Sequence, residues 1–250
     1  MPDEAAGSEA VPPHISAGQL TGNRDFLLFI LSRLANVMGN QIVTVAVGWH
    51  VYLMTGDPLD LGLVGLSQFA PALALFLIAG LAADRFDRRS ILVICNVGQL
   101  VAAGLLLAYM LADRKEVWPI FAILLLQGSA RSFYFTASQA ILPNLVAPSV
   151  FPKAVAWSSS INKAAQLAGP AAGGVLVATV GDWVYLSAVA MFAVAAATAG
   201  LIGTQLSVRP REPFGMAKVL GGFNFVWRNK IVLGAISIDL LAVLFGGVMG

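Results

Sequence analysis

Residues 60–89 read DLGLVGLSQFAPALALFLIAGLAADRFDRR, a long apolar run that passes directly into a cluster of charges. A membrane-spanning helix needs ~20 mostly apolar residues, because lipid offers its backbone groups no hydrogen-bond partner. The apolar part, 60–83, is too long and continuous for a buried strand. It also lacks the ~10-residue alternating segments that are typical of a membrane barrel. The stretch therefore predicts a transmembrane helix that ends at a charged turn.

Outward from this stretch, the same pattern recurs along the chain. Six further apolar runs are long enough to span a bilayer, at about 26–54, 90–112, 118–142, 154–180, 183–205 and 231–250. Charged side chains avoid these runs, and the only exceptions are Arg33, Arg131, Lys163 and Asp239. The sequence thus predicts an all-α fold, a polytopic membrane helix bundle with seven spans.

The overall composition agrees with a membrane protein. Of the 250 residues, 58% are hydrophobic and 11% are charged, and the mean hydropathy is +0.81. Soluble domains carry about 25% charged residues, so soluble enzymes, disordered tails and nucleic-acid-binding proteins are poor fits. One cysteine and two histidines exclude a disulfide framework and a histidine-rich metal site. We find neither a phosphate-cradling Gly-x-x-x-x-Gly-Lys loop nor a His-Glu-x-x-His motif, and we expect no enzymatic activity, metal or cofactor.

The distribution of positive charge predicts the orientation of the chain. Lys and Arg in short connections mark the cytoplasmic side of a membrane protein. The segments on the same side as the N-terminus hold ten such residues, whereas the alternate connections hold only Arg114 and Lys115. We therefore expect a multi-pass protein of the cell membrane with a cytoplasmic N-terminus.

Four regions follow from this pattern. Residues 1–24 are polar, contain Pro12-Pro13 and lack the basic start of a secretory signal, which predicts a disordered cytoplasmic tail. Residues 25–205 form a predicted six-helix transmembrane domain. The connection 206–230 mixes apolar and basic residues, as an interfacial helix does, although a plain linker is the alternative. A seventh span, 231–250, ends at Gly250 without a polar flank, so we expect it to be truncated and the natural protein to continue.

The charged turn after the second run carries the most specific motif. Residues 80–89, GLAADRFDRR, resemble the signature loop Gly-x-x-x-Asp-Arg/Lys-x-Gly-Arg-Arg/Lys of the major facilitator superfamily, with Asp87 in place of glycine. The resemblance implies a cytoplasmic gate that latches two halves of a transporter in one state; its residues would be Gly80, Asp84, Arg85, Arg88 and Arg89.

Two of these gate residues also have a physical rationale. Gly80 lets a neighbouring helix approach closely. Asp84 can accept hydrogen bonds from a partner helix N-terminus or pair with Arg88. The alternative is a positively charged cytoplasmic turn with incidental acids.

A second motif lies in the fifth run. Gly169 and Gly173 form a small-xxx-small face, and Pro170 removes one backbone hydrogen bond, so that the helix can bend. Together with Gly174 these residues resemble the Gly-Pro-x-x-Gly-Gly motif of superfamily exporters that exchange substrate against protons. A plain packing face would explain the glycines alone.

Polar stripes mark three of the predicted helices. At helical spacing, polar or small residues align in the first, fourth and fifth runs as Arg33, Asn36, Asn40 and Thr44; Gln127, Arg131, Tyr134 and Ser138; and Lys163, Gln166, Pro170 and Gly173. A charge that faces lipid costs at least ~2.5 kcal/mol, so these stripes predict a shared hydrated cavity. Structural hydrogen bonding between helices is an equally good explanation for each single amide, and Arg33 can also snorkel to the interface.

Asp239 is the only acid well inside a run. An isolated carboxylate at that depth needs a bound proton or a cationic partner. We predict that Asp239 carries protons and faces Arg131 or Lys163, although a permanent ion pair would fit equally well. Three positive charges and one negative charge at membrane depth favour a cavity that tolerates anionic or amphiphilic substrates.

A weak internal repeat supports the same family. The second run contains Gln-Phe-Ala-Pro-Ala at 68–72, and the fifth contains Gln-Leu-Ala-Gly-Pro-Ala at 166–171. These would be corresponding spans in the 3+3 inverted repeat of a six-helix N-terminal half. Details at 128–135 and 183–185 resemble the branch that contains enterobactin-type siderophore exporters and macrolide efflux proteins.

The resemblance implies a function. A secondary active transporter of this kind exports small molecules by alternating access, driven by protons. Its partners would be a small-molecule substrate, protons, membrane lipid and a missing C-terminal half, with no nucleic acid. The alternatives are a proton-coupled importer with the same fold and a non-transporting membrane scaffold or receptor.

Overall fold

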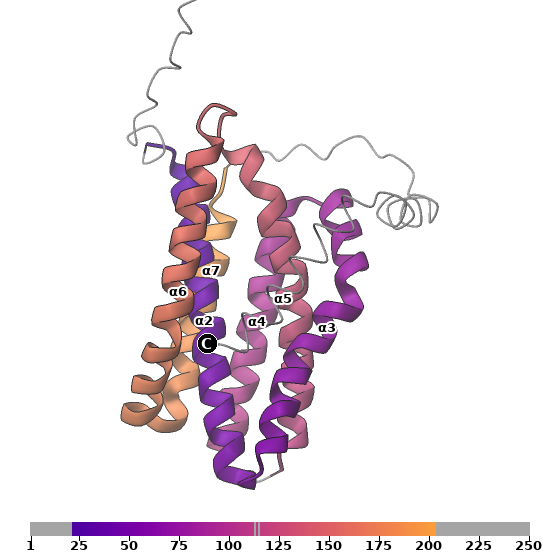
Figure 1. Cartoon of the computed structure of the whole chain (residues 1–250), viewed down its shortest axis with the longest axis vertical. Helices are drawn as coiled ribbons and strands as arrows, with labels where there is room; N and C mark the ends of the chain where they lie inside the picture. The colour runs from indigo at the N-terminus through magenta and orange to yellow at the C-terminus, as the bar shows by residue number, and fades with distance from the viewer. Residues whose placement is uncertain (1–21, 113, 115, 204–250) are drawn as a thin grey trace, which may run out of the picture. The chain divides into compact units, whose positions relative to one another are not determined.

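The computed structural model describes residues 22–112, 114 and 116–203 as a bundle of α-helices that run up and down (Figure 1). Most of the predicted tail, the linker 206–230, the seventh span and Asp239 lie outside these residues. The helices are α2 (Arg24–Thr55), α3 (Pro58–Arg85), α4 (Arg88–Leu111), α5 (Trp118–Leu145), α6 (Phe151–Val180) and α7 (Val184–Gly200), with a 3-10 turn η1 (Gly181–Trp183) between the last two.

The predicted runs coincide with these helices. Each of the first six runs falls on one helix, and the described residues contain no strand, so the all-α prediction is confirmed. Five helical stretches are long and apolar enough to cross a membrane, and the fifth of them, 151–200, includes both α6 and α7. The largest difference is at the end of α7, which stops at Gly200 rather than at 205.

Short polar caps explain where the helices begin. The side chains of Asn23, Asp57 and Asp87 accept hydrogen bonds from the backbone N–H groups of the first turns of α2, α3 and α4. Pro58 follows Asp57 at the first position of α3, where its missing N–H has no helical partner to lose. These caps place the charged connections at the helix ends and leave the apolar segments free to enter the membrane.

Helix α2 is the centre of the bundle. It packs against α6 and α7 and also touches α3 and α5, while α4 packs on α5 and α7 and α3 packs mainly on α5. Close packing holds membrane helices together, because lipid supplies no hydrophobic drive for their association. At Gly39, a Cβ would lie only 3.0 Å from the Phe192 ring, so α2 and α7 approach as closely as a glycine permits.

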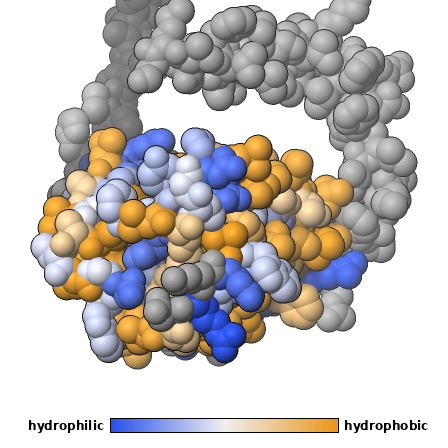
Figure 2. All heavy atoms as spheres, turned by 90° about the horizontal axis from the view of Figure 1, so that it is seen from below, coloured by the Kyte–Doolittle hydropathy of each residue, from blue (hydrophilic) through white to orange (hydrophobic). Residues whose placement is uncertain are grey.

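The loops alternate between the two ends of the bundle. The α2–α3, α4–α5 and α6–α7 connections lie at the lower end in Figure 1, and the α3–α4 and α5–α6 connections lie at the upper end. Figure 2 looks onto the lower end, where hydrophilic and hydrophobic side chains are interspersed. The loop bearing Arg85, Arg88 and Arg89 therefore lies at the end opposite the connection with Arg114.

Candidate functional site

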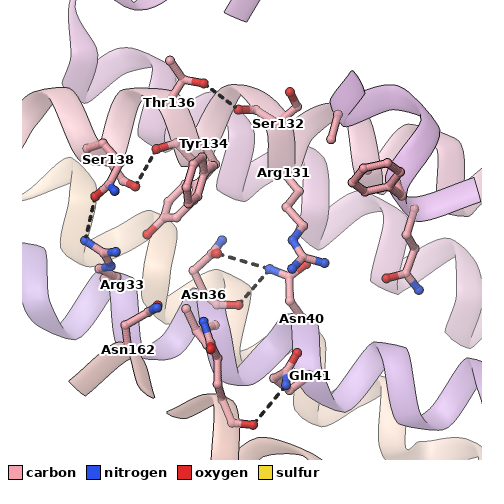
Figure 3. Close-up of a pocket in the computed structure, with 18 of the residues that line it drawn as sticks. Arg33, Asn36, Asn40, Gln41, Arg131, Ser132, Tyr134, Thr136, Ser138 and Asn162 are labelled. Atoms are coloured by element: carbon pink, nitrogen blue, oxygen red, sulfur yellow. Dashed lines mark hydrogen bonds between the residues drawn. The ribbon is translucent and has the colours of Figure 1, made fainter. Parts of the chain in front are cut away.

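A cavity of about 1030 Å³ lies among α2, α3, α5 and α6 (Figure 3). Its polar lining comes mostly from α2 and α5, and its apolar lining includes aromatic rings of α3 and α5. Seven residues of the predicted polar stripes line it: Arg33, Asn36, Asn40, Arg131, Tyr134, Ser138 and Gln166. Polar groups inside apolar helices have therefore been brought together from three segments far apart in the sequence.

The amides of α2 continue behind the cavity into a buried network. Asn36 donates to Asn96 of α4 (Nδ2 to Oδ1, 2.8 Å), and Asn40 donates to Gln99 of α4 (Nδ2 to Oε1, 2.7 Å). Gln127 of α5 reaches Asn40 (Nε2 to Oδ1, 3.4 Å). All five amides are buried, so this network fixes three helices relative to one another.

Arg33 lies at one edge of the cavity among neutral partners. Its guanidinium donates through Nη1 to Ser158 Oγ of α6 (2.9 Å) and to Gln139 Oε1 of α5 (3.5 Å). The side chain is 8% exposed, so it does not snorkel to the interface. Arg33 is therefore a buried cation whose described partners carry no negative charge.

Arg131 extends from α5 toward the α2 side of the cavity in Figure 3. Among the residues that the structure describes, it has no hydrogen bond or ion pair. The hydroxyl of the neighbouring Tyr134 is buried and lies near the Ser32 hydroxyl and the Arg33 guanidinium. Within the described residues, the cavity thus contains one guanidinium without a hydrogen-bond or ion-pair partner.

Helix α3 contributes the aromatic side of the cavity. Phe69 and Phe76, seven positions apart on the same helix face, line it together with Phe135 of α5. Tight packing holds α3 in place, because a Cβ on Gly128 of α5 would lie 2.6 Å from the Gln68 carbonyl oxygen. The lining is therefore polar along α2 and aromatic along α3.

The weak internal repeat maps onto the cavity. Gln68 and Phe69 of α3 and the corresponding Gln166 and Leu167 of α6 all line it. Both glutamines also contact α2, because Thr44 donates to Gln68 Oε1 (3.1 Å) and Gln41 Nε2 donates to the Gln166 carbonyl (3.2 Å). The two matched segments thus occupy related positions on either side of the central helix.

Other predicted cavity residues do not line the described cavity, and Thr44, Pro170 and Gly173 of the stripes are among them. Gln127 is buried behind the lining, in the amide network. Lys163 is exposed on α6 and does not line the cavity, although its neighbours Asn162 and Gln166 do. Asp239 lies outside the described residues, so its part in the site stays a prediction.

The sequence interpretation missed several polar residues that the structure brings to this region. Asn96 and Gln99 lie three positions apart on α4 and therefore share a face, a spacing that could have identified them. Gln139 and Asn162 line the cavity beside Arg33 and Gln166 but belong to no stripe that we recognised. Uncharged amides in an apolar helix give a weaker signal than arginines do.

The predicted gate residues fall into two groups. Arg88 donates to the Ala140 carbonyl of α5 (Nη1 to O, 2.9 Å), and Arg89 donates to the Gly200 carbonyl of α7. Asp84 and Arg85 are exposed and have no hydrogen bond or ion pair among the described residues. Arg88 and Arg89 therefore join helices within this bundle, while Asp84 and Arg85 are available for other contacts.

Two further residues of the same loop differ from expectation. Among the described residues, no atom lies within 4 Å of the place that a Gly80 Cβ would occupy, so the expected close helix approach is not found there. Asp87, which departs from the family pattern, caps α4 by accepting hydrogen bonds from the Ser90 backbone N–H (3.0 Å) and hydroxyl (2.8 Å). The departure thus has a local structural reason.

The glycines of the fifth span pack unequally. A Cβ on Gly169 would lie 2.5 Å from Gln41 Cβ, and one on Gly173 would lie 3.2 Å from Val45 Cβ, both on α2. Gly174 has no described atom within 4 Å of its Cβ position, and Pro170 is exposed within the helix. Gly169 and Gly173 therefore form the close contact of α6 with α2.

A separate polar cluster ties the α6–α7 turn to α2. His50 Nε2 lies 3.0 Å from Asp182 Oδ1, and His50 Nδ1 lies 2.8 Å from the Ala46 carbonyl oxygen and 3.1 Å from Tyr185 Oη. Within the described chain, no three His, Cys, Asp or Glu side chains gather as metal ligands do. We interpret this cluster as a structural tie at the lower end of the bundle.

Comparison with known proteins agrees with this architecture. The family model described as Major Facilitator Superfamily matches residues 29–250. Similar proteins include the multidrug efflux pump Tap of Mycobacterium tuberculosis, 26% identical over 86% of this chain and 54% of its own length. The enterobactin exporter EntS of Shigella boydii is 28% identical over 84% of this chain and 50% of its own.

A third relative, the MFS-type transporter YfiS of Bacillus subtilis, is 27% identical over 68% of this chain and 40% of its own length. The chain thus spans about half the length of the curated relatives it matches. The resemblance of the sequence to this superfamily is confirmed by the family match. The chain belongs to the Major Facilitator Superfamily and is a multi-pass membrane protein.

Proposed function

We propose that the full-length protein is a proton-coupled exporter of small molecules that works by alternating access in the cell membrane. The observation that carries this proposal is a cavity with two arginines and several amides inside an otherwise apolar bundle. Such residues in membrane helices normally serve a substrate or ion path. The relatives named as an efflux pump and an exporter support export rather than import.

In this proposal the cavity opens to one side of the membrane at a time. The described bundle would rock against the C-terminal part of the protein about the cavity. Asp84 and Arg85 would contact that part on the cytoplasmic side in one state and release it in the other. Their exposure, without described partners, supports this role.

Asp239 is the proposed proton carrier. Its carboxylate would take up a proton from outside and release it to the cytoplasm as the substrate moves outward. A cation in the cavity, Arg131, or Lys163 on α6 would face the ionised form and stabilise it. The carboxylate and the substrate would then compete for the same positive charge, which couples the two movements.

The test is transport by the full-length protein in liposomes with an imposed pH gradient. A panel of fluorescent anionic, neutral and cationic compounds is followed in both membrane orientations. We expect proton-driven movement in the export direction, loss of that movement in Asp239→Asn, and retention in Asp60→Asn, which alters a carboxylate at the start of α3. Movement only in the opposite direction identifies an importer, and no flux with any compound contradicts a transporter.

A further inference from the structure

We propose that the cavity recognises amphiphiles that carry one anionic group on an aromatic body. Arg131 would hold the anionic group, Arg33 would add positive charge from the other side of Tyr134, and the rings of α3 would hold the aromatic body. This inference rests on the proposed function, because such a compound would be the exported substrate. It adds the chemical class and the residues that select it.

The first step is the unpaired charge of Arg131. A guanidinium has five N–H donors and stays protonated, and in the described structure none of those donors has a partner. The Arg131 side chain is exposed in the described structure and lines the cavity, so its donors are open to a ligand. The planar fork of the guanidinium matches a carboxylate, sulfonate or phosphate, which accepts two parallel hydrogen bonds.

The neighbouring donors point to the same ligand chemistry. Arg33 uses only Nη1 in its described hydrogen bonds, to a hydroxyl and an amide. Tyr134 is 5% exposed and lines the cavity, with its hydroxyl near Ser32 and Arg33. Figure 3 places the Tyr134 ring on the same side of α5 as Arg131, with both side chains directed toward α2. Arg131 therefore offers the guanidinium for the acceptor group, while Arg33, on the other side of the Tyr134 ring in Figure 3, adds a second positive charge to the same cavity.

No acidic side chain competes for these donors in the described part of the cavity. Arg33 and Arg131 are the only charged side chains among the described lining residues. The described acids lie in the turns and at the helix ends, as Asp57 and Asp182 do. The lining therefore attracts an anion and repels a cation of the same shape.

The apolar side of the cavity defines the rest of the ligand. Phe69, Phe76 and Phe135 line it and remain largely exposed, at 63%, 66% and 61%. Exposed aromatic rings in a pocket gain free energy when they cover an apolar or aromatic surface. A small anion without an apolar body would leave these rings uncovered, so the geometry favours an amphiphile.

The experiment measures equilibrium binding rather than transport. The full-length protein in nanodiscs is titrated calorimetrically with 2-naphthoate, 2-naphthamide and 2-naphthylmethylammonium, which share one aromatic body. We expect naphthoate to bind about tenfold more tightly than the amide, and the ammonium compound to bind most weakly. Empty nanodiscs provide the correction for partition into lipid.

Variants then locate the anion-binding group. Arg131→Gln should bring naphthoate to the affinity of the amide, Arg131→Lys should retain part of the preference, and Tyr134→Phe should weaken naphthoate a few-fold. Arg24→Gln, which removes an exposed cation at the start of α2, should leave all three affinities unchanged. If Arg131→Gln does not fold, Arg131→Lys and Tyr134→Phe still test the site.

Several outcomes overturn the inference. Equal binding of the three compounds does so, and so does an anion preference that survives in Arg131→Gln or disappears in Lys163→Gln alone. Proton-driven export of a cationic or neutral dye without any anion preference overturns it while the proposed function stands. An anion preference that depends on Arg131, in a protein without flux, supports the site and contradicts the exporter.

Discussion

Asn40 connects three helices through its side-chain amide. It donates to Gln99 and shares further hydrogen bonds with Asn36 and Gln127. Gln99 Nε2 and Gln127 Oε1 have no described partner, so both amides depend on Asn40 for their described side-chain hydrogen bonds. A buried polar group without a partner is costly, which makes Asn40 the most sensitive position of the network.

We therefore expect Asn40→Ala to lower the free energy of unfolding by about 1–3 kcal/mol. Ser129→Ala should change it by less than about 0.5 kcal/mol, because the Ser129 hydroxyl is exposed and bonds only to the Leu125 carbonyl of its own helix. Thermal unfolding of the purified protein, followed by circular dichroism, measures both. Equal stability of the two variants would contradict a structural role for the network.

Substitutions of Arg88 and Arg85 in the charged loop should also differ in their effect on stability. Arg88→Ala removes a charged hydrogen bond to the Ala140 carbonyl and should cost about 1.5–3 kcal/mol of stability. Arg85→Ala should leave stability within about 0.5 kcal/mol, because Arg85 is exposed without a described partner. If Arg85 belongs to the gate, its variant will lose transport at normal stability. An Arg85→Ala variant that is destabilised but transports normally would contradict a role for Arg85 in the gate.

Single residues also mark the limit of sequence reasoning. Arg33 and Arg131 could be assigned to a cavity from the sequence because a charge in an apolar helix has few tolerable places. Asn96 and Gln99 could not, since a neutral amide can bond to its own helix or to any neighbour. Lys163 has the helical spacing of the α6 stripe, but spacing alone does not show whether a residue at the edge of a stripe faces the cavity or another surface.

At the scale of helices, three glycines of α6 differ in how much room they leave for a side chain beside α2. A methyl group at Gly169 would enter the Gln41 side chain at 2.5 Å, at Gly173 it would press on Val45 at 3.2 Å, and at Gly174 it would meet open space. Alanine favours a helix over glycine by about 1 kcal/mol. In a glycine-to-alanine substitution on α6, steric clash with α2 lowers stability, whereas the higher helix propensity of alanine raises it.

The alanine series should follow this order. Gly169→Ala should destabilise the protein by about 1–3 kcal/mol, because the helices must separate. Gly173→Ala should have a smaller effect, and Gly174→Ala should be neutral or stabilise by up to about 1 kcal/mol. Unfolding midpoints of the three variants, measured together, provide the test. Equal midpoints would mean that α6 does not pack on α2 through these glycines.

The helices themselves could be predicted from the sequence because length and hydropathy set them. The run 60–83 became α3, Pro58–Arg85, and its charged end became the loop before α4. The ends were set by caps such as Asp87, whose role depends on one hydrogen bond and not on composition. Which helices meet could not be predicted, because apolar faces in lipid are alike on all sides.

For the whole molecule, water should reach the cavity from at least one side of the membrane. The single cysteine, Cys95, is buried, so the native chain should react little with polar thiol reagents. Cysteines introduced at Asn36 and Arg131 should react readily. A cysteine at Ile94, exposed on α4 away from the cavity, should stay unreactive because it faces lipid.

Labelling of the full-length protein in membranes, with a charged methanethiosulfonate reagent, measures these rates. Opening to one side at a time also predicts that the cavity cysteines change reactivity when the transmembrane pH gradient is reversed. Unreactive cysteines at both cavity positions, under either gradient, would contradict a hydrated cavity. The Ile94→Cys variant serves as the matched lipid-facing control.

The network behind the cavity is built from amides, and amides neither gain nor lose protons in the range where proteins fold. Asn36, Asn40, Asn96, Gln99 and Gln127 therefore keep the same donors and acceptors in acidic and alkaline surroundings. The hydrogen bonds that join α2, α4 and α5 through these amides therefore do not change with pH. Any response of the protein to acidity must then arise at its ionisable side chains and not in this amide network.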